Sequence, residues 1–353
     1  MRVATENHCD DQSGRVDSVE KLRTIIKPPA KMVAEKRQSI FEPAGQYLLD
    51  RVCGAAFVTA GQGDSFHTSM ATGKPGFARI LDATTICVSG IDEESVSNLR
   101  ADAGFGGLFM IPGIDYTVRV NAKFLEASGD AVDLRLDEAY FHCPKAYMRS
   151  SLWASNDIQE EASSSTEAAV GLDDEMRSFL ALSSFAFLAT RGQAGGFDVS
   201  PRGDGPGFLR SLEDGRLVLP DRPGNRIADS LINIIESGRL GLLSLVPGSM
   251  RALQINAQAE LICDEARLAE SAVNGKVPKL GIALAPNQLR WIDFEREWAG
   301  VMWDETQRTG IEDTVSFGKL LARQGLLGGK RAQGMKGWAL DVALRQEAKR
   351  TLF

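Results

Sequence analysis

The segment PDRPGNR, residues 220–226, places basic and amide side chains just before a helix-like stretch. Arg222, Asn225 and Arg226 stand at the start of NRIADSLINIIESG, which is predicted to form an amphipathic helix that ends at Gly238. Cations are unfavourable at a helix N-terminus, whereas an anion gains from the free backbone N–H groups and the helix dipole. A bound phosphate would remove this conflict, with the arginines as paired donors. The alternative is two exposed loop arginines without a ligand.

The chain offers few other groups for acid–base or metal chemistry. Its three histidines are His8, His67 and His142. His142 is the candidate for proton transfer or iron ligation, although a lone histidine is more often a structural residue. No Ser/His/Asp arrangement has a spacing typical of nucleophilic catalysis, and we expect no metal site. The cysteines form no CxxC pair, so we expect reduced, mostly buried thiols. They are Cys9, Cys53, Cys87, Cys143 and Cys263.

These residues lie within a sequence that repeats itself. SMATGKPGFAR, residues 69–79, has the same pattern as SPRGDGPGFLR, residues 200–210, at a separation of 131 residues. VNAKF and INAQA repeat the pattern further on, where Asn121 and Asn256 are 135 residues apart. A period this long indicates a duplicated domain rather than a solenoid. Each copy alternates short strands and turns around one helix, which predicts a small antiparallel barrel and a mainly β fold with some helices (α+β).

The domain boundaries follow from the repeat and from composition. Residues 1–153 form the first copy with an N-terminal helical segment, and residues 172–310 form the second copy. The polar, Ser/Glu/Ala-rich residues 154–171 read as a linker. Residues 311–353 are a basic C-terminal extension, predicted to be helical. A fused pair of this kind can form, within one chain, the two-fold interface of a dimer, after which its two sites can diverge.

Composition limits the class of partner. The net charge of −7 and the pI near 5.3 argue against nucleic-acid binding, which depends on basic residues. No apolar run is long enough to span a bilayer, and the N-terminus lacks the apolar core of a signal peptide, so we expect a cytoplasmic protein without a membrane partner. The expected partner is a small molecule; further dimerisation of the chain stays open.

The segments SPRGDGPGFLR, LVLPDRPGNRIADSLINI and LVPG, with DEAYFHCPKAYMRSSLW at residues 137–153, resemble the pyridoxamine 5'-phosphate oxidase-like FMN-binding split-barrel family. The resemblance implies two six-stranded split barrels that form an intramolecular pseudo-dimer. It also implies FMN at the interface, with the phosphate held by one copy and the ring covered partly by the other. Ser200, Arg202 and Gly203 would then line the flavin edge.

Each copy has lost a different half of this site. The first copy has Glu93 and Glu94 where the second has Asn225 and Arg226, and glutamates repel phosphate. The first copy instead keeps the residues that would cover the flavin ring from the other side of the interface. These residues are Arg119, Lys145, Arg149 and Trp153. The second copy has Gln254 where the first has Arg119. The two half-sites predict one composite flavin site per chain.

Three functions remain open. The first is an FMN-dependent oxidoreductase of unknown substrate, with a nicotinamide donor or oxygen as its redox partner. The second is a haem-binding or haem-processing protein on the same barrel, with His142 as axial ligand. The third is a flavin-binding or structural module without turnover. An absorption spectrum separates flavin from haem.

Overall fold

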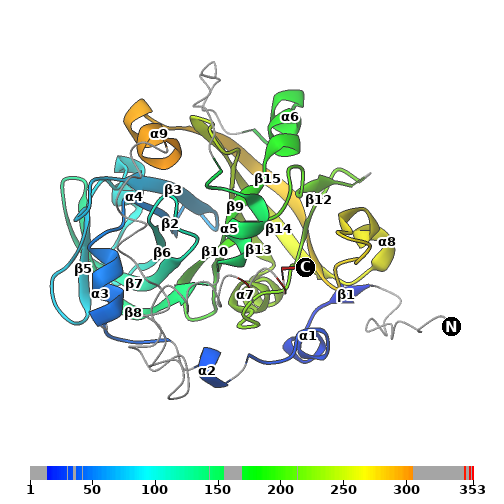
Figure 1. The fold of residues 1–353 in the computed structure, drawn as a ribbon, viewed down its shortest axis with the longest axis horizontal. Helices are drawn as coiled ribbons and strands as arrows, with labels where there is room; N and C mark the ends of the chain where they lie inside the picture. The colour runs from blue at the N-terminus through cyan, green and yellow to red at the C-terminus, as the bar shows by residue number, and fades with distance from the viewer. Residues whose placement is uncertain are drawn as a thin grey trace.

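The structure is a computed structural model in which the two halves of the chain form two antiparallel sheets (Figure 1). It describes residues 14–29, 31–34, 37–41, 43–142, 144–154, 169–212 and 214–304, with Gln346, Arg350, Leu352 and Phe353. Most of the predicted linker lies outside the described residues. The predicted helical extension also lies outside them, apart from the four residues named last.

The first sheet has the strand order β3-β2-β6-β7-β8-β5-β4. Its strands are β2 (Gly54–Ala60), β3 (Phe66–Thr72), β4 (Ala78–Ile80), β5 (Thr85–Val88), β6 (Gly104–Met110), β7 (Thr117–Ser128) and β8 (Ala131–His142). The helices of this half are α3 (Pro43–Leu49), α4 (Glu93–Asn98) and α5 (Lys145–Ser150). Strand β6 is buried at every position, whereas β8 begins with alternating buried and more exposed residues, as expected of a strand with one covered face.

The second sheet has the order β10-β9-β13-β14-β15-β12-β11, with β1 attached to β14. Its strands are β1 (Arg15–Val16), β9 (Phe185–Arg191), β10 (Phe197–Gly203), β11 (Arg210–Ser211), β12 (Leu217–Pro220), β13 (Arg239–Leu245), β14 (Arg251–Ile262) and β15 (Gly281–Asp293). Its helices are α6 (Asp174–Leu182), α7 (Asp229–Ser237), α8 (Glu265–Leu268), a 3-10 turn (Ala269–Ser271) and α9 (Arg296–Trp303). Except for β1, the order repeats that of the first sheet strand for strand, which confirms the predicted duplication and the mainly β fold.

The two sheets meet through contacts that repeat the internal symmetry. Gly106 and Gly241 occupy equivalent positions on β6 and β13, each opposite the asparagine of the following strand. A Cβ on Gly241 would lie 2.7 Å from Cβ of Phe66, and a Cβ on Gly106 would lie 3.0 Å from the backbone of Phe197. The two phenylalanine rings then meet edge to face at 6.0 Å. Glycine at both positions lets the sheets approach, and each sheet inserts one aromatic ring into the other.

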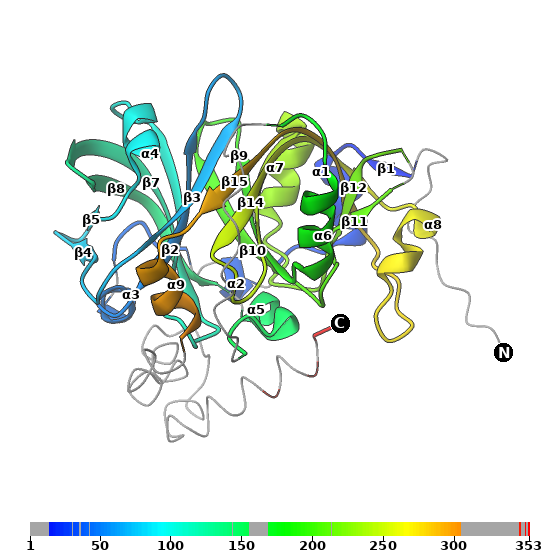
Figure 2. The ribbon, with the colours of Figure 1, turned by 90° about the horizontal axis from the view of Figure 1, so that it is seen from above.

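The N-terminal segment crosses to the second sheet. Strand β1 pairs with Leu261 and Ile262 of β14, and helix α1 (Val19–Ile25) lies beside α7 in both views (Figures 1 and 2). Leu22 is fully buried in the apolar core of the second sheet. A short helix α2 (Lys31–Ala34) follows and leads back toward the first sheet. This segment was grouped with the first copy from its position in the sequence, but its buried leucine completes the core of the second.

One expectation about the cysteines is wrong. Cys53 is a free, buried thiol and Cys87 a free, half-buried one, and burial raises the pKa of both. Cys263, however, is disulfide-bonded. Sequence spacing failed here because a disulfide depends on the distance between two cysteines in the fold.

None of the helices in the described part of the chain has both the length and the hydropathy required to cross a membrane.

Candidate functional site

A cavity of 1460 Å³ lies between the second sheet and the end of the first copy. Its walls are the end of β10, the loop from β12 to α7, helix α5, and residues 275–280. Ten of the eleven predicted site residues line it. They are Ser200, Arg202, Gly203, Arg222, Asn225 and Arg226 from the second copy and Arg119, His142, Lys145 and Arg149 from the first. The eleventh, Trp153, instead stacks on Tyr147, donates to the Ile114 carbonyl and packs near Trp303 in the apolar core.

The loop before α7 has an uncommon backbone conformation. Arg226 and Ala228 have φ angles of 63° and 67°, in the left-handed region that costs a non-glycine residue on the order of 1 kcal/mol. The Asn225 side chain accepts a hydrogen bond from the Ile227 amide at 3.0 Å. Helix α7 therefore begins at Asp229, four residues later than predicted, although it ends at Gly238 as expected. The predicted basic first turn is wrong, because the arginines precede the helix and its first residue is acidic.

Two of the predicted phosphate-binding or flavin-lining arginines are already paired with carboxylates of the same cavity. Arg202 Nη1 lies 2.6 Å from Asp221 Oδ1, and Arg222 Nε lies 2.5 Å from Asp204 Oδ2. Within the described residues, the exposed Arg226 makes no ion pair. Arg226 is thus the cation of this loop most available to an incoming anion, whereas Arg202 and Arg222 are fixed in the cavity wall.

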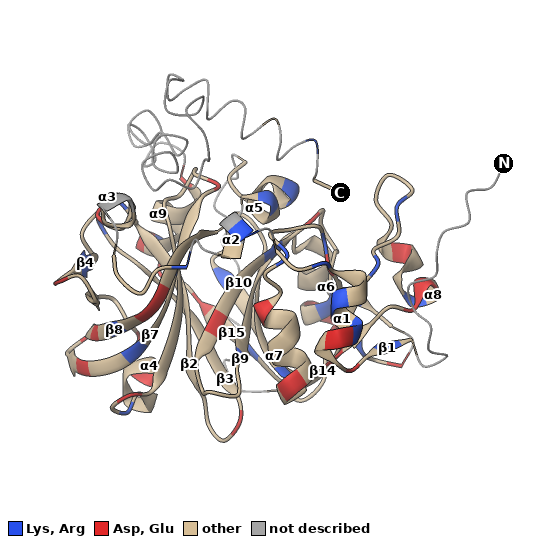
Figure 3. Cartoon of the chain, turned by 90° about the horizontal axis from the view of Figure 1, so that it is seen from below, with Lys and Arg blue, Asp and Glu red and all other residues tan. Residues whose placement is uncertain are grey.

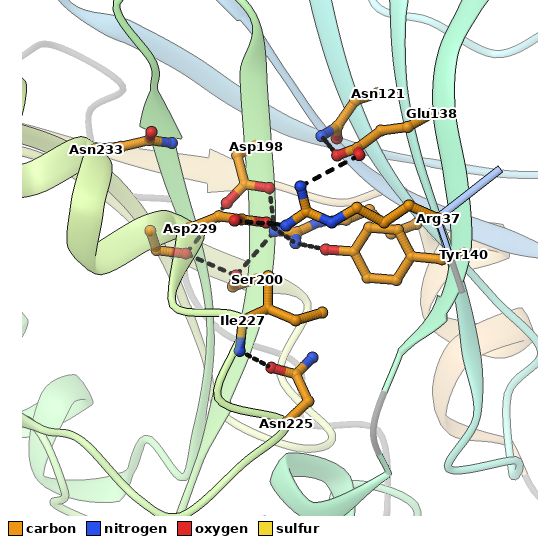
Figure 4. Close-up of polar contacts among 12 residues, drawn as sticks. Arg37, Asn121, Glu138, Tyr140, Asp198, Ser200, Asn225, Ile227, Asp229 and Asn233 are labelled. Carbon is orange, nitrogen blue, oxygen red and sulfur yellow. Dashed lines mark hydrogen bonds and ion pairs between the residues drawn. The ribbon is translucent and has the colours of Figure 1, made fainter. Parts of the chain in front are cut away.

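A buried charge cluster joins the two copies at the inner end of the cavity (Figure 4). Arg119, on β7, is 2% exposed and forms an ion pair with Asp198 of β10. Its Nε donates to the Val199 carbonyl at 2.8 Å and its Nη2 to Ser200 Oγ at 2.9 Å. Its Nη1 donates to the hydroxyl of Tyr140. One guanidinium therefore links β8 of the first sheet to three successive residues of β10.

Burial and charge act in opposite directions in this cluster. Burial would lower the pKa of Arg119, but Asp198 and Tyr140 raise it, so the guanidinium stays charged. Burial raises the pKa of Asp198, and Arg119 only partly offsets this. Burial likewise raises the pKa of Tyr140, which remains a neutral phenol and stacks 6.4 Å from the ring of His142.

The acidic first residue of α7 is neutralised by Arg37, which comes from the N-terminal segment. Arg37 Nη2 lies 2.6 Å and 2.5 Å from the two carboxylate oxygens of Asp229. Its Nη1 lies 3.5 Å from Glu138 Oε2 (Figure 4). Arg119 Nη1 also lies 3.8 Å from Asp229. Burial raises the pKa of Glu138, while Arg37 opposes this shift.

Helix α5 of the first copy closes the cavity from the opposite side. Arg149 Nε donates to the Gly203 carbonyl at 3.0 Å, and its Nη1 to the Leu352 carbonyl at 2.9 Å. A Cβ on Gly203 would lie 2.2 Å from the Ala146 carbonyl oxygen, so glycine is required here for the approach of α5. The ring of Phe353 also lines the cavity, 5.8 Å from the guanidinium carbon of Arg222.

The equivalent position in the first copy is filled by a different polar cluster. Strand register makes Gln254 the equivalent of Arg119, and Arg290 the equivalent of Tyr140. His67 is 4% exposed and lies 3.1 Å from Asp92 and 3.3 Å from Glu94. Arg290 Nη1 lies 2.6 Å from the other carboxylate oxygen of Glu94.

This cluster corrects one step of the sequence argument. Glu94 was expected to repel phosphate, but Arg290 and His67 compensate its negative charge. Asp92 caps α4 by accepting from the Ser95 amide at 2.8 Å. Burial would raise the pKa of Asp92, but hydrogen bonds from His67 and Ser95 lower it below its ordinary value. Side-chain carboxylates thus already occupy the helix N-terminus that a phosphate would need.

The cavity of the second copy suits an anion. Nine lysines and arginines line it, against four aspartates and glutamates. The basic residues are Lys27, Arg119, Lys145, Arg149, Arg202, Arg222, Arg226, Lys276 and Lys279. Figure 3 shows Lys and Arg on α2 and α5, and both basic and acidic residues on α1. In addition, the buried Arg202 Nε has no acceptor within the described residues, so it is a donor that a ligand could satisfy. The described residues contain no group of side chains suited to a metal ion.

Several residues of the buried charge cluster around Arg119 were not predicted from the sequence. A signal existed for Asp198, because the side chains of residues 198, 200 and 202 share one face of a strand. The link from Asp229 to Arg37 had no such signal, since the two residues are far apart in the sequence.

Part of the chain matches a known protein family. Residues 172–298 match the family model described as pyridoxamine 5'-phosphate oxidase. None of the curated proteins matches the chain. A putative pyridoxamine 5'-phosphate oxidase from Lactobacillus delbrueckii is 20% identical over 34% of this chain and 93% of its own, with a TM-score of 0.26. HupZ from Group A Streptococcus is 16% identical over 35% of this chain and 95% of its own, with a TM-score of 0.29.

The family match covers the sheet that supplies β10, the loop before α7 and helix α7. These elements carry six of the predicted site residues, and the first sheet repeats their strand order. Residues 172–298 therefore form a domain of the pyridoxamine 5'-phosphate oxidase-like split-barrel family.

Proposed function

We propose that the chain is an FMN-dependent oxidoreductase in which two split barrels form an intramolecular pseudo-dimer with one flavin site. The observation that carries this proposal is a basic cavity in which predicted residues of both copies meet. The family of residues 172–298 supports it, because the matched region supplies the loop and helix start on the anion side. The buried donor Arg202 Nε fits a ligand with several acceptor atoms.

The residues divide into two groups by position. Arg226, with the loop before α7 and the free N–H groups at the helix start, would hold the phosphate. Arg202 and Ser200, together with Lys145 from the first copy, would face the flavin ring. Arg222 acts indirectly, since its bonds to Asp204 and to the Ser271 carbonyl hold the wall in place.

FMN, when bound, supplies the hydride or electron transfer, so the protein needs no strong nucleophile of its own. The task of the chain is then to bind, orient and exclude water. Arg119 stays charged because Asp198 and Tyr140 outweigh the effect of burial on its pKa, and it fixes Ser200 by donating to the Ser200 hydroxyl. His142, at the cavity wall, is the candidate for holding a proton near a bound substrate.

The first copy's equivalent position should not bind a second flavin. Its helix start is capped by Asp92, and its charges are paired internally through His67, Glu94 and Arg290. A phosphate would have to displace these bonds and would meet two carboxylates. We therefore expect one FMN per chain.

The purified protein's absorption spectrum and a calorimetric titration with FMN test this function. We expect flavin bands at about 450 nm and a stoichiometry near one, followed by turnover with NADH, NADPH or oxygen. An intense Soret band would instead favour the haem-binding alternative, with His142 as ligand. Flavin binding without turnover with any donor would favour a non-catalytic flavin-binding module. A stoichiometry of two would contradict the composite site.

A further inference from the structure

Helix α1 reaches the strained loop through one side chain. Arg23 Nη1 donates to the Arg226 carbonyl and its Nη2 to the Ile227 carbonyl, both at 3.0 Å. These carbonyls belong to the stretch in which Arg226 and Ala228 have left-handed backbone angles. Such a conformation persists only where surrounding contacts compensate its cost. Arg23 supplies two charge-assisted hydrogen bonds at this point.

The same contacts orient the loop's amides. In a trans peptide the C=O and N–H groups point in opposite directions. Because the Ile227 carbonyl points toward Arg23, the Ala228 N–H points away from helix α1. The N–H of Ile227 is already bonded to the Asn225 side chain, whereas the described residues supply no acceptor for the Ala228 N–H, which remains for a ligand. Arg23 thereby turns the loop's acceptors to one side and leaves its donors on the other.

A second arginine of the N-terminal segment removes a charge conflict. Asp229 is the first residue of α7, where its carboxylate would repel a phosphate. Arg37 contacts both carboxylate oxygens of Asp229 and neutralises that charge. Arg23 and Arg37 therefore act on the two consecutive parts of the anion side, the loop and the helix start.

We propose that Arg23 and Arg37 are positioning residues for the phosphate end of the cofactor, so that the N-terminal segment completes the site on the second copy. This inference rests on the proposed function. It assigns a role to a segment that lies outside the matched family region. Neither residue needs to touch the flavin, since Arg23 acts through the loop backbone and Arg37 through Asp229.

The test compares FMN with riboflavin, which lacks the phosphate. Apo-protein is titrated with each flavin, and the ratio of the two dissociation constants reports the phosphate contribution. We expect wild type to prefer FMN, and Arg23→Gln to weaken FMN binding about tenfold or more while changing riboflavin binding little. Arg23→Lys should restore only part of the preference, because one ammonium cannot bridge both carbonyls with the same fork.

Arg37→Gln should also reduce the preference, and adding Asp229→Asn should recover much of it, because no unpaired carboxylate then remains. The matched control is Arg15→Gln on β1, an exposed arginine that lies outside the cavity lining and should leave both affinities unchanged.

The outcomes separate the two proposals. If wild type binds neither flavin, the proposed function fails and this inference fails with it. If wild type prefers FMN and Arg23→Gln keeps the same ratio, or loses affinity for both flavins equally, the positioning role is overturned while the function stands. Thermal unfolding without flavin checks that each variant folds. If Arg23→Gln does not fold, Arg37→Gln and its double variant with Asp229→Asn provide the test. A double variant that recovers no preference for FMN would refute the role of Arg37.

Discussion

Replacing Arg119 by glutamine introduces the side chain found at the equivalent position, Gln254, without the partners that Gln254 has. Arg119 and Asp198 are both nearly inaccessible to solvent, at 2% and 4% exposure. Removing the cation leaves a buried carboxylate without a counter-charge, which typically costs about 3–5 kcal/mol. At roughly 2–4 °C per kcal/mol for a domain of this size, Tm should fall by roughly 6–20 °C at neutral pH.

The loss should depend on pH with a definite sign. Burial raises the pKa of Asp198 in the folded protein, so the folded state binds more protons than the unfolded state between the two pKa values. Stability is therefore lost as pH rises through the folded pKa. Without Arg119 that pKa rises further, and Arg119→Gln should be least destabilised near ~pH 5 and most destabilised near ~pH 8.

Urea unfolding of the wild type and the variant across this range measures the effect. The double variant Arg119→Gln with Asp198→Asn should regain most of the stability and lose the extra pH dependence. Arg135→Gln is the matched control, because Arg135 pairs with Asp102 at 2.6 Å but both are exposed, so about 1 kcal/mol or less is expected. If Arg119→Gln cost no more than this control, or if its stability rose with pH, the buried-pair reasoning would be refuted.

Two further substitutions test the cavity wall. Arg226→Glu should lower FMN affinity by about a hundredfold or more, because a charge-assisted donor is replaced by a repelling carboxylate. Riboflavin affinity should change little. Equal titration curves with FMN for variant and wild type would mean that the phosphate lies elsewhere. Gly203→Ala should lower Tm and weaken flavin binding together, because its Cβ would lie 2.2 Å from the Ala146 carbonyl oxygen; an unchanged Tm would show that α5 can move aside without cost.

The sequence was most informative where a local pattern decides the structure. The repeat predicted the duplication because equal residues at equal spacing build equal strands, as the positions of Asn121 and Asn256 illustrate. Gly238 was predicted correctly as the end of α7, since a left-handed C-cap is a local property of glycine. The predicted site residues also converged on one cavity, with the exception of Trp153.

The start of α7 could not be predicted in the same way. Asn225, Arg226 and Ile227 fit a helix by local preference, but Arg226 and Ala228 adopt left-handed angles in the folded chain. The compensation comes from Arg23, 203 residues away from Arg226 in the sequence. No local pattern encodes a contact of that range. The acidic first residue of the helix, Asp229, was overlooked for the same reason, since the effect of its charge on an anion depends on the distant Arg37.

The two polar clusters are the basis for proposing one flavin site in a duplicated chain. In the second copy's cavity Arg119 and Asp198 pair with each other at the inner end, so the other lining residues retain an excess of cations. In the first copy's position the charges pair across the space itself, since His67 and Arg290 both reach Glu94. Both arrangements hold the copies together, because Arg119 donates to β10 and Gln254 donates to the Phe66 carbonyl on β3. Divergence could therefore close one site without weakening the interface, because the cluster that fills it still links the two sheets.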